Sequence, residues 1–265
     1  MSTTSLRTIL PQGRRTIHIG WVLFPVFLLL TWHILAVILD GFALVTPMVT
    51  AVVLIDGFTS GWIISDTWIT VFELTIAYVL VAISGVWLGV MLGLNEFWKE
   101  VFEPTILGTY SIPKVTLFPI FLFMFGLGVD SKIAFGWFHG VFPVMILTMN
   151  AMTSINDEHL KVARSFGLSR WQTFREVIMP SILPGLVIGL RLGFSLTFLG
   201  IILGEMFAAR AGLGYELMIY MSSVQIDRML AIITLLILIA AAINAVFYAI
   251  ESKIERGDTT SGVRM

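Results

Sequence analysis

Long apolar segments, separated by short polar ones, occupy most of the sequence. Six of them follow one another along the chain, at about residues 19–39, 66–94, 104–128, 132–153, 182–208 and 229–251. A helix of ~20 residues spans the ~30 Å hydrocarbon core of a bilayer, because each residue adds ~1.5 Å. The pattern therefore predicts an all-α integral membrane protein of about six transmembrane helices. They form one domain, 19–252, between an N-terminal segment (1–18) and a tail (253–265).

The third apolar segment differs from the others, because Pro113, Lys114 and Pro119 interrupt it. A proline lacks the backbone N–H and leaves a carbonyl group that lipid cannot satisfy. We therefore expect this segment to lie inside the bundle or along a water-filled path rather than to face lipid.

Residues 156–180 form the only long polar stretch between apolar segments. Asn156 is suited to cap a first helix, and Gly167 to end it in the left-handed conformation. Ser169 and Gln172 have the spacing of a capping box for a second helix, which we expect to end or bend near Pro180. A helix–glycine–helix unit between two spans predicts a docking element for a soluble partner.

The basic residues are distributed unevenly between the two sides of the predicted membrane. If the N-terminus lies inside, inner segments hold eleven of the 16 Lys and Arg residues, outer segments hold three (Lys132, Arg210 and Arg228), and spans hold Lys114 and Arg191. Because basic residues concentrate in cytoplasmic segments, both termini and the 156–180 loop are predicted to be cytoplasmic. Residues 40–65, which contain no Lys or Arg, are predicted to form an outer loop.

Composition supports a membrane protein and excludes several other classes. The chain is 57% hydrophobic and only 12% charged, and it contains no cysteine, which excludes disulfides and cysteine-ligated metals. Its net charge of −1 does not indicate binding to nucleic acid. The chain has no G-x-x-x-x-G-K-[ST] phosphate loop, H-E-x-x-H or G-x-S-x-G motif, and its four histidines lack metal-ligand spacing. We expect neither catalysis nor a metal site in this chain.

The 156–180 loop resembles that of permease subunits of binding-protein-dependent ABC importers, whose pattern is E-A-A-x3-G-x9-I-x-L-P. The corresponding residues here are Lys161, Val162, Ala163, Gly167, Val177, Met179 and Pro180. The spacing is intact, although Lys161 and Val162 replace the acidic residue and the first alanine. The stretch from Val162 to Gly193 is similar to the nitrate/taurine/aliphatic-sulfonate branch, and the resemblance covers about residues 60–252.

The resemblance implies a type I importer permease fold with a cytoplasmic coupling helix, in the cytoplasmic (inner) membrane of a bacterium. It also implies two permease copies, two ATPase subunits that hold ATP and Mg²⁺, and a periplasmic or lipid-anchored binding protein that delivers a small, anionic solute. The candidate ATPase-coupling residues are Glu158, Lys161, Ala163, Arg164, Gly167, Arg170 and Pro180. The candidate pathway residues are Tyr110, Pro113, Lys114, Arg191, Ser195 and Glu205. The candidate contacts with the binding protein are Arg210, Gly212, Asp227 and Arg228.

Four charged residues, Glu73, Lys114, Arg191 and Glu205, fall within or near the ends of predicted spans. Because a charge in the bilayer is costly, each is expected to face the bundle interior, a partner or water. Two interpretations remain open: the bases line an anion path, or acids and bases pair, as Lys114 with Glu73. Arg191 and Glu205 cannot pair within one chain, because fourteen residues place them ~21 Å apart on one helix. We expect a structural role for Arg191 and a pathway role for Lys114.

Glycines recur at every fourth position in two predicted spans. Gly85, Gly89 and Gly93 form one stripe, and a second stripe is formed by Gly185, Gly189 and Gly193, with Gly200 and Gly204 beyond it. Glycines at this spacing let the backbone of another helix approach closely. Both helices are therefore predicted to pack tightly within the bundle.

Two other functions compete with the permease interpretation. A secondary transporter or channel requires an ion site at the midplane and often inverted repeats, and neither is evident here. An intramembrane enzyme requires a nucleophile–base pair, and none is recognisable. Co-purification of a P-loop ATPase distinguishes the permease from both alternatives.

Overall fold

The computed structural model describes residues 14–39 and 43–261, and every regular element in those ranges is helical. Parts of the predicted N-terminal segment, outer loop and tail, residues 1–13, 40–42 and 262–265, lie outside the described residues. The elements are α1 (Arg14–Ile38), α2 (Pro47–Ser60), α3 (Ile64–Gly93), α4 (Glu96–Tyr110), the 3₁₀ helix η1 (Lys114–Leu117), α5 (Phe118–Phe125), α6 (Val129–Thr153), α7 (Asp157–Ser165), α8 (Arg170–Thr173), the π-helical turn η2 (Phe174–Ile178), α9 (Met179–Ala208), α10 (Leu213–Ser222) and α11 (Ile226–Ser261).

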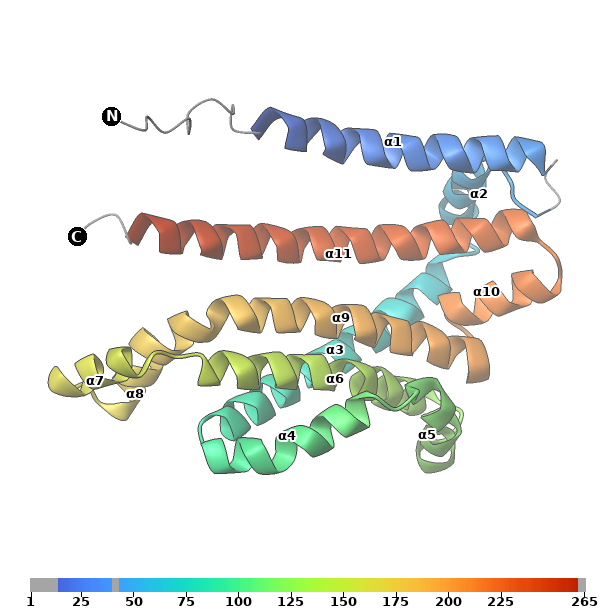
Figure 1. Ribbon diagram of the computed structural model, residues 1–265. Coiled ribbons are helices and arrows are strands. Elements are labelled where there is room, and N and C mark those ends of the chain that lie inside the picture. Colours follow the sequence, from blue (N-terminus) through green and yellow to red (C-terminus); the bar gives the residue numbers. More distant parts are fainter. Residues whose placement is uncertain (1–13, 40–42, 262–265) are drawn as a thin grey trace, which may run out of the picture.

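Four helical stretches are long and apolar enough to cross a membrane: α3, α6, Arg170–Ala208 and Ile226–Ile254. They confirm four of the six predicted spans. The predicted span 19–39 lies in α1, in which the part with described side chains, Leu23–Ile38, is apolar. Figure 1 shows that α1 begins, and α11 ends, at the end of the molecule that carries α7 and α8. The opposite end carries α5 and α10, and we call it the α10 end.

The predicted span 104–128 is not one continuous helix. The chain instead forms α4, breaks after Tyr110, and continues as η1 and α5 at an angle of 86° to α4. Pro113 precedes η1 and Pro119 lies in the first turn of α5. At the start of a helix the N–H groups have no partner within the helix, so a proline there loses no helical hydrogen bond. The segment is only partly enclosed: Lys114 and Phe118 are buried, whereas Phe123 of α5 is 91% exposed.

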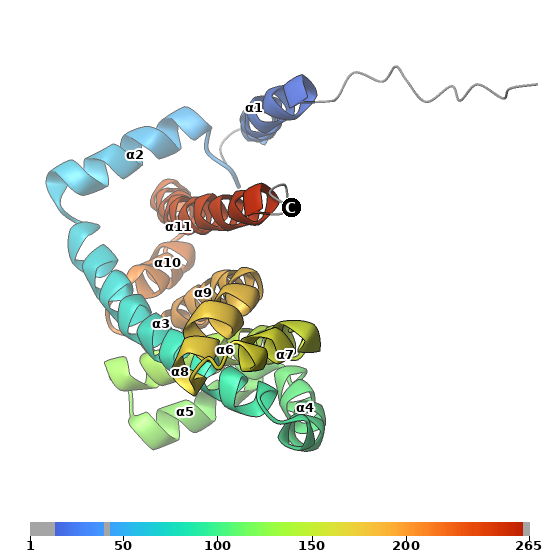
Figure 2. The ribbon, with the colours of Figure 1, turned by 90° about the vertical axis from the view of Figure 1, so that its left-hand side faces the viewer.

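Helix α6 lies between α3 and α9 and forms the centre of the bundle (Figure 2). The glycine stripes are the reason for this packing. A Cβ atom added to Gly89 would lie 2.6 Å from Cβ of Thr148, and one added to Gly185 would lie 2.8 Å from Cβ of Ala151. Since α6 also presents Gly136 to Ile201 of α9, no larger side chain fits at these crossings. The predicted close packing of both glycine-bearing helices is confirmed.

The segment predicted as an outer loop, 40–65, contains the apolar helix α2. Thr46 caps its first turn, Pro47 begins it, and Gly61 ends it with a φ of 89°. The next residues, Trp62 and Ile63, pack with α10 and α11 in an apolar cluster at the α10 end. The low polarity of residues 47–55 was the signal that this segment is helical and not an open loop.

Candidate functional site

The 156–180 loop begins with a helix whose two ends are capped as predicted. The side chain of Asn156 accepts a hydrogen bond from the backbone N–H of Glu158 at 2.9 Å. At the other end Gly167 adopts a φ of 68°, its N–H donates to the carbonyl of Arg164, and the N–H of Leu168 donates to that of Ala163. These two bonds form a Schellman motif, in which a left-handed residue satisfies the last carbonyl groups of a helix. Gly167 therefore fixes the angle at which the chain leaves α7.

The second half of the loop starts with the predicted capping box. The hydroxyl oxygen of Ser169 accepts from the N–H of Gln172, and the side chain of Gln172 accepts from the N–H of Ser169. We expected this helix to end or bend near Pro180, and it does not end there. It passes through the π-helical turn η2 and continues as α9, with Pro180 in the first turn of α9. A π turn can accommodate the missing proline N–H without ending a helix, because it changes which carbonyl groups are paired.

The loop exposes large apolar side chains at the end of the molecule where it projects beyond α6 and α9 (Figure 1). Phe166 is 80% exposed and Trp171 is 69% exposed, on either side of Gly167. Beside them, a groove of about 540 Å³ between α7 and the start of α9 is lined by residues that include Val162, Ala163 and Pro180. Exposed aromatic side chains on a polar loop are typical of a protein-binding surface.

The charged candidates of this loop, Glu158, Lys161, Arg164 and Arg170, are all exposed. Ala163, which belongs to α7, differs from them because it is buried and lines the groove. The structure thus brings together the residues predicted for coupling on one projecting unit. Sequence reasoning missed Phe166 and Trp171, although aromatic residues within the one long polar stretch were the signal.

Lys114 occupies the break between α4 and α5 and is buried against α6. Its Nζ atom donates to the carbonyl of His139 at 3.3 Å and lies over the rings of Tyr110 and Phe142, 4.3 and 5.0 Å from their centroids. Neither ion pair found in the described part of the chain includes Lys114. The pairing with Glu73 that we considered is therefore wrong. Tyr110, whose ring lies beside this ammonium group, is exposed, and so is Pro113, which precedes Lys114 in the chain.

The partner of Glu73 is Lys132, near the start of α6, with 2.7 Å between Nζ and Oε1. Both side chains are almost completely buried, so Lys132 does not belong to an outer loop as the basic count had assumed. Arg191 pairs with Glu251 of α11 at 2.8 Å, and Ser195 donates to the carbonyl of Arg191. Sequence reasoning missed both partners because they are distant in sequence from the residues they neutralise.

Glu205 is fully buried at the α10 end of α9 and far from Arg191, as the helix geometry required. One carboxylate oxygen accepts from the hydroxyl of Thr70 and the other from the backbone N–H of Gly214, each at 2.7 Å. The side chain of Glu205 therefore joins three separate segments, α3, α9 and α10.

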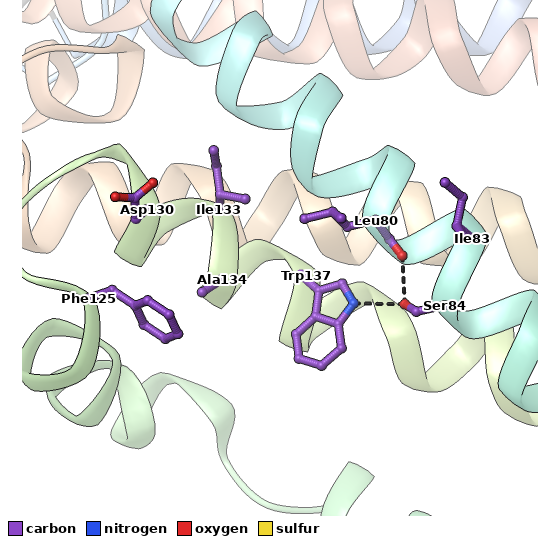
Figure 3. Close-up of a pocket in the computed structure, with 8 residues that line it drawn as sticks. All are labelled: Leu80, Ile83, Ser84, Phe125, Asp130, Ile133, Ala134 and Trp137. Carbon is purple, nitrogen blue, oxygen red and sulfur yellow. Dashed lines mark hydrogen bonds between the residues drawn. The ribbon is translucent and has the colours of Figure 1, made fainter.

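A second cavity, of about 550 Å³, lies between α3, the end of α5 and α6 (Figure 3). Its lining is mainly apolar, and the indole of Trp137 there donates to the hydroxyl of Ser84 at 2.8 Å. The one charged lining residue is Asp130. This cavity is therefore unsuited to bind an anion.

Comparison with known proteins identifies the family. The sequence model of the "Binding-protein-dependent transport system inner membrane component" family matches residues 85–257, about two thirds of the chain. The chain belongs to this family. The matched range contains the 156–180 loop and the glycine-packed helices α6 and α9.

Several curated permeases are similar to this one. The putative aliphatic sulfonates transport permease SsuC of Bacillus subtilis is 23% identical over 75% of this chain and 74% of its own length. The putative ABC transporter permease MJ0413 of Methanocaldococcus jannaschii is 25% identical over 86% and 88%. The nitrate import permease NrtB of Synechococcus elongatus is 28% identical over 60% and 57%.

Solved structures support the fold. A chain of the inward-facing MetNI methionine ABC transporter superposes with a TM-score of 0.61 at 18% identity, covering 71% of this permease and 94% of that chain. At this identity the likeness establishes the fold alone. The protein is thus a permease component of an ABC importer with the type I permease fold.

The residues predicted to meet a binding protein do not form one exposed surface in the permease. Arg210 is exposed, whereas Gly212 is buried and donates its N–H to Asp66. Asp227 and Arg228 are half-buried, and the guanidinium of Arg228 lies 5.1 Å from the ring centroid of Trp62. Arg210 is therefore the most exposed of the four candidates.

Proposed function

We propose that this permease forms the translocation pathway for a small, anionic solute, which an extracytoplasmic binding protein delivers and a cytosolic ATPase drives inward through the 156–180 loop. Two identical copies complete one pathway, and two ATPase subunits bind ATP and Mg²⁺. The family, whose description names binding-protein-dependent transport, supports this assembly.

The observation that carries the coupling proposal is the shape of the 156–180 loop. It is a rigid unit, because a Schellman motif and a capping box fix both of its helices. It presents Phe166 and Trp171 to the surroundings at one end of the bundle. A soluble ATPase that covers these rings would gain apolar burial of roughly 2 kcal/mol per side chain and could then pull on α6 and α9 directly.

The basic residues support a cytoplasmic position for this loop, in the inner membrane of a bacterium. Lys161, Arg164 and Arg170 are exposed on the loop, and Lys99 lies at the same end of the bundle. Since cytoplasmic segments carry the excess of Lys and Arg, this end is the inner one. The start of α1 and the end of α11 lie at the same end and then face the cytoplasm as well.

The unpaired ammonium of Lys114 supports an anionic solute. Its position in a helix break, next to the partly exposed Tyr110, places a positive charge where the backbone is already open. SsuC and NrtB are named for anions, aliphatic sulfonates and nitrate. Another relative, ThiX of Halalkalibacterium halodurans, is named for formylaminopyrimidine. The charge of Lys114, rather than the relatives' names, is the reason to expect an anion here.

Replacing Gly167 with valine tests the coupling proposal. A left-handed conformation costs a residue with a side chain about 1–2 kcal/mol, and a β-branched residue more, so the Schellman turn should open. We expect the Gly167→Val permease to insert into membranes normally but to lose the P-loop ATPase that co-purifies with the wild type.

Gly61→Val is the matched control. Gly61 also has a positive φ, 89°, with open space around its missing Cβ, as Gly167 does, but it lies at the α10 end. The control should therefore suffer similar local strain and keep the ATPase. If Gly167→Val retains its ATPase and its transport, the 156–180 loop is not the coupling element.

A further inference from the structure

The first turn of α10 has no capping residue of its own. The residue before the helix is Gly212, which has no side chain, and its φ of 108° is one that side chains rarely allow. The first N–H groups of any helix lack partners within the helix, and leaving them unsatisfied in a buried site is costly. At the start of α10 these groups are buried, so acceptors must come from elsewhere in the fold.

Three side chains from two other helices supply those acceptors. Asp66 accepts from the N–H of Gly212 at 2.7 Å and Thr70 from that of Leu213 at 2.8 Å. Glu205 accepts from the N–H of Gly214 and also from the hydroxyl of Thr70. We call Asp66, Thr70 and Glu205 the clasp. Asp66 and Thr70 lie one turn apart on α3, and Glu205 lies on α9.

The glycines around the clasp are required by its geometry. A Cβ atom on Gly214 would lie 2.7 Å from Cβ of Glu205, and one on Gly212 would lie 2.5 Å from its carboxylate carbon. The backbone of α10 can therefore reach the carboxylate only because both residues are glycine. The carboxyl oxygens of Glu205 also lie at the positive end of the α10 dipole, where hydrogen-bond acceptors are stabilised.

Opening the clasp would be expensive. Separating α10 from α3 or α9 would leave buried N–H groups and a buried carboxylate without partners, and each such group costs more than an ordinary hydrogen bond contributes. The other end of α10 is joined to α11 instead, where Tyr220 contacts Arg228 and packs with Ile232. Helix α10 is thus fixed at its start to the two helices that flank α6.

We infer that Asp66, Thr70 and Glu205 are positioning residues for transport, which keep α10 joined to α3 and α9 throughout the ATP cycle, so that a displacement of α10 moves both helices. This inference rests on the proposed function, because it makes α10 the helix that transmits contact with the binding protein, at the α10 end, to the rest of the bundle. It also gives Glu205 a role other than lining the pathway.

Hydrogen–deuterium exchange of the clasp amides tests the inference directly. The permease, purified with its ATPase, is compared without nucleotide and trapped with ATP and vanadate. We expect the peptide that contains Gly212, Leu213 and Gly214 to be equally protected in both states. Exchange that becomes much faster in the trapped state would overturn the inference, since the clasp would then open during the cycle. This comparison uses the wild-type protein and does not depend on any variant.

Variants of Thr70 separate positioning from general stability. Thr70→Val removes the hydroxyl that links Leu213 to Glu205 and should accelerate exchange of that peptide by about tenfold or more. It should also lower solute uptake per ATP hydrolysed. Thr70→Ser keeps the hydroxyl and should restore both properties. Thr75→Val is the control, because Thr75 is exposed on the same helix and donates only to the carbonyl of Val71.

The outcomes distinguish this inference from the proposed function. If no ATPase accompanies the wild-type permease, the proposed function fails, and the inference fails with it. If the ATPase is present and Thr70→Val couples uptake to ATP hydrolysis as the wild type does, only the positioning role of the clasp is refuted.

Discussion

The buried ion pair between Lys132 and Glu73 makes a quantitative prediction about stability. Its side chains are 6% and 0% exposed, and 2.7 Å separates the charged atoms. Replacing Lys132 with methionine removes the ammonium but keeps an unbranched stem, which matters because this stem packs against Gly204. The carboxylate of Glu73 would then be buried without its counter-charge, beside the carboxyl group of Glu205.

The expected loss follows from the cost of an uncompensated buried charge. Removing one partner of such a pair typically destabilises a protein by about 3–5 kcal/mol, whereas replacing both partners by apolar residues of similar volume is often nearly neutral. We therefore expect Lys132→Met to lower the free energy of unfolding by about that amount. The double variant Lys132→Met/Glu73→Met should recover most of the loss.

A double-mutant cycle in mixed micelles, followed by reversible unfolding with SDS, measures the coupling energy between the two residues. The pair Arg191–Glu251 is the matched control. Its atoms are separated by a similar distance, 2.8 Å, but its side chains are 31% and 17% exposed. Because solvent screens such a pair, its coupling should be about 1 kcal/mol or less. A coupling energy for Lys132–Glu73 no larger than that for Arg191–Glu251 would refute the reasoning.

Two further predictions concern glycine packing and the pathway. Gly89→Val should prevent α3 from packing on α6, because a Cβ atom there would lie 2.6 Å from Cβ of Thr148. The control Gly108→Ala, where nothing lies within 4 Å, should be neutral or stabilising by up to about 1 kcal/mol. Thermal unfolding in detergent measures the stability of both variants. Lys114→Met should lower solute uptake while the ATPase still co-purifies and hydrolyses ATP. The ammonium group that attracts the anion is lost, but no ion pair among the described residues is broken. Full uptake would exclude a pathway role for Lys114.

Much of the local structure was predictable because its determinants are close together in sequence. The caps at Asn156 and Ser169 and the stop at Gly167 depend on residues within a few positions of each other, and all three formed as predicted. The glycine stripes were readable for a similar reason, since one helix suffices to show an i, i+4 pattern. The stripes could not show which helix they pack against, and for both stripes that helix is α6.

Composition and local patterns were enough to establish the class of the protein, the main apolar helices and the polar loop between two of them. Hydropathy and local capping are sums over neighbouring residues, so they need no knowledge of the fold. The pairing of the charged residues in the spans became visible only in the folded chain: Glu73 with Lys132, Arg191 with Glu251, and Glu205 with Thr70. The break after Tyr110 was likewise a matter of context, because proline permits a bend but the surrounding helices set its angle. Packing of the helices brings together partners more than fifty residues apart, and local patterns in the sequence do not reveal that packing.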